Sequence, residues 1–199
     1  MERATVESRA EWRAWLAAHH ATSPGVWLVT WKQGSGRPRV PYDVVVEEAL
    51  CFGWVDSLPR KLDARRTMLR VTPRKRGSAW SAPNKARVER LTAAGLMTPA
   101  GLAAVEAAKA DGSWTRIDAA QAEQVPPDLA AALAADADAA RHWAAFPPSA
   151  RKGILEWILQ AKGADTRARR VAATVAEARV NRRANAYRQP KGAGPKPPA

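Results

Sequence analysis

Residues 54–84 combine a carboxylate, cationic side chains and two indoles. Arginine binds carboxylates and phosphates through two parallel hydrogen bonds, and a helix that begins near Ser81 would add free N–H donors. We therefore expect this region to form a cleft for an anionic, planar or carboxylated ligand. The structural alternative is one ion pair on a solvated sheet face beside two core tryptophans. The candidate residues are Trp54, Asp56, Ser57, Arg66, Arg70, Arg74, Lys75, Trp80, Ser81 and Asn84.

Two expected strands position the first part of this set. Residues 54–58 are typical of a strand, so Trp54 and Asp56 should share one face. Residues 66–72 alternate, which predicts a half-buried strand with Arg66 and Arg70 on the same face. If the two strands pair, Asp56 could meet one of these arginines.

A second basic set lies on the expected last helix, which Asp165 caps and which runs to about Arg183. One interpretation is a solvated basic helix. The other is docking to nucleic acid or an anionic surface, because phosphate contacts release counterions. This basic-surface set is Arg167, Arg170, Arg179, Arg182 and Arg183.

Charge is distributed unevenly along the 199 residues. The chain has 32 Lys and Arg against 19 Asp and Glu, a net charge of +13. Residues 58–90 and 151–199 each carry +9, whereas the other segments are weakly acidic. A clustered positive field concentrates anions, including nucleic acid. The alternative is a GC-rich genome, which would also make arginine, alanine and proline abundant.

The composition argues against several classes of protein. One cysteine excludes an internal disulfide, and three histidines with one cysteine argue against a zinc site. Cys51 should be buried and inert on an apolar helix face. The apolar runs are too short to span a bilayer, and there is no secretory signal pattern. We expect a cytoplasmic protein with no metal and no cofactor.

Periodicity predicts an α+β fold, with a small, mostly antiparallel sheet packed by helices and a largely helical C-terminal half. We expect an α+β core over residues 1–112, a helical region over 113–183, and a disordered basic tail over 184–199. Expected helices cover residues 8–20, 43–52, 81–95, 98–111, about 126–145, 147–162 and 165–183, and expected strands cover 26–32, 54–58 and 66–72.

Several stretches resemble the bacterial YdeI/OmpD-associated family, also called bacteriocin-protection proteins. The resemblance covers most of residues 8–183 and implies a link to envelope stress or bacteriocin tolerance, without a reaction. It depends on Glu11-Trp12-Arg13 with Trp15-Leu16, Gly25-Val26-Trp27-Leu28, Glu47 through Ser57, Thr72-Pro73-Arg74, Trp80-Ser81 with Asn84, Met97 through Gly101, Trp157-Ile158 with Ala161-Lys162, and Thr166 through Arg170.

Three functional hypotheses follow. The first is a non-enzymatic cytoplasmic accessory protein of this stress-response type that binds an anionic small molecule or protein partner through residues 54–84. The second is a nucleic-acid-binding protein that uses residues 60–90 and 151–191, with weak, non-specific affinity. The third is an enzyme with Asp56 as acid/base and the arginines as an electrophilic clamp. The sequence favours a non-enzymatic role.

Overall fold

A computed structural model of the chain describes residues 1–186 and 188–197. It divides into two compact units, of which the first contains residues 1–78 and 82–114, and the second residues 79–81 and 115–199. Unit 1 comprises β1 (Glu2–Thr5), α1 (Arg9–His19), β2 (Val26–Trp31), α2 (Tyr42–Cys51), β3 (Trp54–Lys61), β4 (Arg66–Pro73), α3 (Ala82–Ala93) and α4 (Pro99–Ala110). Unit 2 comprises α5 (Asp118–Gln121), α6 (Pro127–Ala134), α7 (Ala137–Ala145), α8 (Pro148–Leu159) and α9 (Ala164–Arg179).

The α+β class and the helical C-terminal half are confirmed, but the sheet is mixed rather than mostly antiparallel. Its order is β1-β2-β4-β3. The β4 strand pairs antiparallel with both β2 and β3, whereas β1 pairs parallel with β2. No alternation of residues indicates β1, because in this edge strand only Ala4 is buried and its polar neighbours resemble a loop.

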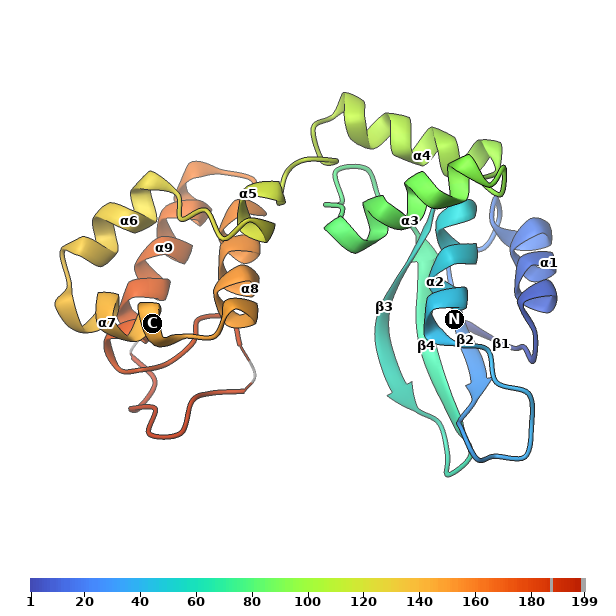
Figure 1. Cartoon of the computed structure of the whole chain (residues 1–199), viewed down its shortest axis with the longest axis horizontal. Helices are drawn as coiled ribbons and strands as arrows, with labels where there is room; N and C mark the ends of the chain where they lie inside the picture. The colour runs from blue at the N-terminus through green and yellow to red at the C-terminus, as the bar shows by residue number, and fades with distance from the viewer. Residues whose placement is uncertain (187, 198–199) are drawn as a thin grey trace. The chain divides into compact units, whose positions relative to one another are not determined.

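The alternation of residues along β2 and β4 gives the sheet two different faces. Val26 and Leu28 on β2 and Val71 on β4 point to one face and are fully buried. Helix α2 lies across this inner face (Figure 1), and Val45 and Leu50 belong to its buried side. The opposite, outer face carries Trp27 and Trp31 on β2, and Arg66 and Arg70 on β4.

Buried acids connect α2 to its neighbouring helices. The Glu48 side chain is 1% exposed and accepts from Arg9 (2.5 Å) and Arg13 (2.7 Å), both on α1. Glu47 is paired with Arg9 and with Arg90 of α3. The apolar stripe of α1 supports the same contact, since Trp12 is fully buried and donates its indole N–H to the Val45 carbonyl. Charge pairs and apolar packing therefore hold α1 on α2.

Helix α4 approaches the end of α2 closely at Gly101. A Cβ atom at Gly101 would lie 2.2 Å from the Cys51 carbonyl oxygen, so a side chain has no room there. The Thr98 hydroxyl and backbone N–H both donate to that oxygen, at 2.6 and 3.0 Å. These bonds satisfy a carbonyl that the end of α2 would otherwise leave without a partner.

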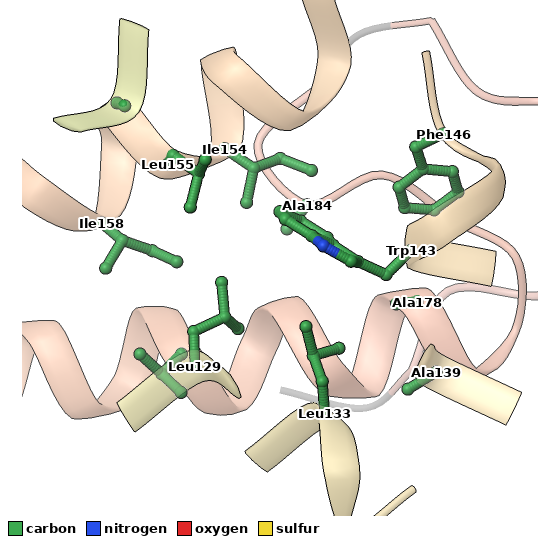
Figure 2. Close-up of a cluster of buried hydrophobic side chains, with 12 residues drawn as sticks. Leu129, Leu133, Ala139, Trp143, Phe146, Ile154, Leu155, Ile158, Ala178 and Ala184 are labelled. Carbon is green, nitrogen blue, oxygen red and sulfur yellow. The ribbon is translucent and has the colours of Figure 1, made fainter. Parts of the chain in front are cut away.

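Unit 2 is a helical bundle with its own core. Figure 2 shows Leu129 and Leu133 of α6, Trp143 of α7, and Ile154, Leu155 and Ile158 of α8 gathered beside α9. The expected single helical stretch over 126–145 is two helices, because Asp136 interrupts it and caps α7 by accepting from Ala139 N–H. Within the described residues, no helix is both long and apolar enough to cross a bilayer.

The described part of the tail lies against the end of α9. Ala184 is 4% exposed and belongs to the unit 2 core, and Gly194 N–H donates to the Val180 carbonyl. The Gln189 side chain bonds the backbone N–H and carbonyl of Arg183. Disorder of residues 184–199 stays a prediction for solution, and residues 187, 198 and 199 lie outside the described residues.

Candidate functional site

A cavity of about 530 Å³ lies between the inner face of the sheet, the beginning of α2 and the segment that precedes α2. Its size falls in the range of sites for small molecules. Apolar side chains (Leu28, Val40, Val45 and Leu69) form part of the lining. The full lining is Leu28, Thr30, Trp31, Lys32, Gln33, Arg39, Val40, Tyr42, Val45, Asp56, Ser57, Pro59, Thr67, Met68 and Leu69.

A carboxylate and a phenol meet at the β3 end of this cavity. The Tyr42 hydroxyl donates to Asp56 Oδ2 at 2.7 Å. Burial, and then this bond and the nearby negative charge, raise the pKa of Tyr42 to about 12. The phenol therefore stays protonated at neutral pH, and Ser57 adds a second hydroxyl at this end.

Cationic side chains lie toward the opposite end of the cavity. On β4, Val71 pairs with Asp56 of β3, and Thr67 pairs with Thr30 of β2. Val71 and Thr67 are four residues apart, so about 13 Å of strand separates the two ends of the cavity. Lys32 lies two residues after Thr30, and its ammonium group donates hydrogen bonds to the carbonyls of Asp63 (2.7 Å) and Ala64 (3.2 Å). Because carbonyls carry no net charge, the ammonium keeps its positive charge. Arg39 is exposed on the same lining.

Of the predicted site residues on β3, two line the cavity and one lies in the core of unit 1. Asp56 and Ser57 line the cavity, and Ser57 Oγ donates to the Arg70 carbonyl at 3.3 Å. Trp54 is 1% exposed, donates its indole N–H to the His20 carbonyl, and meets Trp15 edge-on. Trp54 is therefore a core residue of unit 1 rather than a wall of the cavity.

The structure places the predicted basic residues of β4 away from Asp56. Asp56 pairs with Val71, so it faces the inner side, whereas Arg66 and Arg70 point to the outer side. Arg66 instead pairs with Asp63 at 2.7 Å. Asp56 therefore meets neither arginine.

Arg74 is the predicted arginine whose charge is close enough to interact with Asp56. Burial lowers the pKa of Arg74 to about 10, and the Asp56 carboxylate opposes that shift. The backbone N–H of Arg74 donates to the Gly53 carbonyl, and Lys75 is exposed beside it.

The remaining predicted residues lie elsewhere. Trp80 is fully buried, and with Ser81 it belongs to the short segment that groups with unit 2. Asn84 is on α3, where its carbonyl accepts from Arg87 at 3.1 Å. The predicted set therefore contributes Asp56 and Ser57 to the cavity, while its indoles are buried.

Sequence reasoning missed Lys32, Arg39 and Tyr42 as cavity residues. The signal available was a lysine at the end of an alternating strand and an arginine in the Gly- and Pro-rich segment before a helix. That segment looked like an ordinary flexible loop. Tyr42 begins α2, and only the packing of α2 on the sheet brings it to Asp56.

The basic-surface set is largely occupied by bonds within unit 2. Arg167 forms a bidentate bond to Asp128, with 2.6 and 2.9 Å contacts. Arg179 pairs with Asp136, and Arg182 with Glu177. Arg170 donates to the Trp157 carbonyl, and the Arg183 guanidinium lies over the Phe146 ring. The hypothesis of nucleic-acid docking by α9 gains no support from these contacts.

Two family models match separate parts of the chain. One, described as "Bacteriocin-protection, YdeI or OmpD-Associated", matches residues 123–181, which confirms the expected resemblance for most of unit 2. The other, described as "Domain of unknown function (DUF8412)", matches residues 4–104, which contain the whole cavity. No curated protein and no solved structure matches the chain.

Proposed function

The chain belongs to the family described as a domain of unknown function (DUF8412) and carries a YdeI/OmpD-associated domain, and from this premise we propose that it is a ligand-binding accessory protein. Its ligand is a small molecule with an apolar body and an anionic group. The cavity of unit 1 takes the ligand. The protein acts in the cytoplasm, in bacteriocin tolerance or envelope stress.

The observation that carries the proposal is the distribution of chemistry along one cavity. Leu69, with the buried Leu28 and Val45 behind it, would cover the apolar body, and transfer of that body from water into the cavity favours binding through the hydrophobic effect. Lys32 and Arg39 would attract the anionic group at one end. The Tyr42–Asp56 pair gives the other end a fixed polar group, which suits orientation of a ligand.

The protonated phenol favours binding over acid–base catalysis by Asp56. A general base must accept a proton from substrate near the working pH. Asp56 already accepts a hydrogen bond from the Tyr42 hydroxyl, and the Tyr42 pKa of about 12 keeps that proton on the phenol. We therefore propose a non-enzymatic role, with Asp56 as a positioning group.

The test uses the fluorescent dye 1-anilinonaphthalene-8-sulfonate, which joins an apolar ring system to a sulfonate. Arg39→Glu should weaken dye binding about tenfold, since one lost charge contact in a partly solvated site costs about 1.4 kcal/mol. Lys32→Gln should weaken it in the same direction. Arg76→Glu is the matched control, because Arg76 is an exposed arginine of unit 1 outside the lining.

A second variant tests the location of binding. Leu69→Trp would fill part of the cavity and should abolish dye binding, while the thermal midpoint shows that unit 1 remains folded. Unchanged binding by Leu69→Trp and by the Lys32 and Arg39 variants would refute the proposal. For the cellular role, a deletion strain should be more sensitive to bacteriocin, and the Arg39→Glu gene should fail to restore tolerance.

A further inference from the structure

The outer face of the sheet in unit 1 presents two indoles among arginines. Trp27 and Trp31 are half-buried on β2 and lie four residues apart, about 13 Å along the strand. Their cross-strand partners on β4 are Arg70 and Arg66. We call Trp27, Trp31, Arg60, Arg66 and Arg70 the outer-face cluster. Trp31 also borders the cavity, whereas Trp27 and the three arginines of the cluster are not part of its lining.

Guanidinium groups lie over both indoles. Arg60 of β3 is 5.1 Å from the centroid of Trp27. Trp31 has three such neighbours, Arg37 at 5.4 Å and Arg65 and Arg66 at 5.5 Å. Such contacts are attractive, but they leave the positive charge of the arginine in place.

Carboxylates compensate only part of this charge. Glu7 accepts from Arg37 and from the Trp31 indole N–H, and Asp63 pairs with Arg66. Within the described part of the chain, no carboxylate forms an ion pair with Arg60 or Arg70. Arg3, which lies beside Trp27 on β1, also has no such partner there. The exposed arginines around Trp27 therefore form a positive surface.

We propose that the outer-face cluster binds single-stranded nucleic acid with little sequence preference. Bases stack on Trp27 and Trp31 or on the guanidinium planes beside them, and Arg60 and Arg70 contact phosphates. The 13 Å between the indoles corresponds to about four stacked nucleotides at about 3.4 Å each. A duplex keeps its bases stacked inside and cannot present them to a sheet face, so a single strand fits better.

This site differs from the cavity of the proposed function, although Trp31 borders both. The cavity takes a small molecule between α2 and the inner face, whereas the cluster takes a polymer on the opposite face. Because Trp27, Arg60 and Arg70 lie outside the cavity lining, variants at these residues can weaken nucleic-acid binding while dye binding is unchanged. The cluster also differs from the basic surface of α9, whose arginines are largely held by acids and carbonyls of unit 2.

The test measures fluorescence anisotropy of labelled dodecathymidylate with the full chain at about 50 mM salt. Trp27→Ala should weaken binding by roughly 5- to 100-fold, the range typical of one lost base stack. Trp27→Phe should retain most of the affinity, because a phenyl ring still stacks. Arg60→Ala and Arg70→Ala should each reduce the slope of log affinity against log salt by about 0.7.

Trp157 provides the matched control. It lies in unit 2 with the Arg170 guanidinium 5.1 Å from its centroid, the same distance as for Arg60 and Trp27. Trp157→Ala should leave the affinity for dodecathymidylate unchanged. An equal loss in both variants would show that any tryptophan–arginine pair contributes, and would overturn the assignment to the outer face.

Three other results would overturn the proposal. The first is no binding of dodecathymidylate at 50 mM salt. The second is duplex binding that is as tight as single-strand binding. The third is binding to phosphatidylglycerol vesicles or polyglutamate that dodecathymidylate does not displace. If Trp27→Ala lowers the thermal midpoint strongly, the Trp27→Phe variant and the two arginine variants decide the outcome, because unchanged binding in both arginine variants would refute it.

Discussion

The arginines of α9 and those of the outer face of the sheet come from two segments of equal charge, +9 each. In unit 2, carboxylates form ion pairs with Arg167, Arg179 and Arg182. On the sheet, the guanidinium of Arg60 instead lies over the indole ring of Trp27. A carboxylate neutralises the charge of the arginine that it pairs with, whereas an indole leaves that charge in place, so the arginine still attracts anions. The partner, rather than the charge of the segment, therefore determines which region can attract an anion.

The largest expected effect concerns a buried carboxylate. Glu48→Ala should lower the free energy of unfolding of unit 1 by about 1–3 kcal/mol, because Arg9 and Arg13 lose a charged acceptor and a cavity remains. Both arginines are about 40% exposed and can return to water, which keeps the loss below that of a fully buried pair. Denaturant unfolding measures it.

Glu89→Ala is the control for Glu48, since Glu89 is an exposed acid on α3. Its effect should stay within about 0.5 kcal/mol. Equal stability of the two variants would show that the arginines of α1 do not depend on this carboxylate, and would weaken the distinction between paired and stacked arginines.

A smaller effect is expected at Asp128. The Arg167 side chain holds the pKa of the Asp128 carboxyl below its usual range. A lowered pKa stabilises the folded state above the unfolded pKa of about 3.9, and this contribution disappears as the pH falls through the folded pKa. Because Asp128 is partly exposed, Asp128→Asn should cost under about 1 kcal/mol at pH 7.

As the pH falls below the folded-state pKa of Asp128, the thermal stability of the same variant should approach that of the parent, since the carboxyl is then protonated in both states of the parent. Thermal unfolding at pH 7 and at low pH checks both statements. A difference that grows toward low pH would have the wrong sign and would contradict the ion-pair explanation.

The inner face of the sheet gives a third case, in which a phenol rather than an arginine bonds the carboxylate. The pKa of Tyr42 is raised to about 12, so the stabilisation from its bond to Asp56 is complete below about pH 10 and decreases between pH 10 and 12. Ultraviolet titration should show one tyrosine with this high pKa, and Tyr42→Phe should remove it. Its retention in Tyr42→Phe would contradict the assignment to Tyr42.

The smallest effect on stability is expected on the outer face. Arg70 is exposed, so Arg70→Ala should change the free energy of unfolding by less than about 0.5 kcal/mol. Denaturant unfolding beside Glu48→Ala measures the contrast. A loss of several kcal/mol would show that Arg70 is a structural partner and would remove the difference between the two regions.

Local pattern predicted the individual helices and strands well, because caps and alternation are local properties. The Ser8 cap of α1 and the alternation over residues 66–72 are examples, and each agrees with its element. The parallel pairing of β1 could not be predicted, since it depends on contacts with β2 rather than on its own polar residues.

The candidate site was harder to predict because register is a tertiary property. Asp56 pairs with Val71, but a bulge then shifts the register so that Pro59 pairs with Leu69. A shift of one residue would have placed Asp56 beside Arg70 on the outer face. Similarly, Lys32 and Tyr42 reach the cavity through the packing of α2 on the sheet, which no spacing in the sequence encodes.

The close approach of Gly101 to the end of α2 has a kinetic consequence. Cys51 is fully buried beneath this joint, and burial raises the pKa of its thiol. It is also the only cysteine of the chain. A thiol reagent can therefore reach the protein only when unit 1 opens, so the rate of labelling measures the opening of this unit.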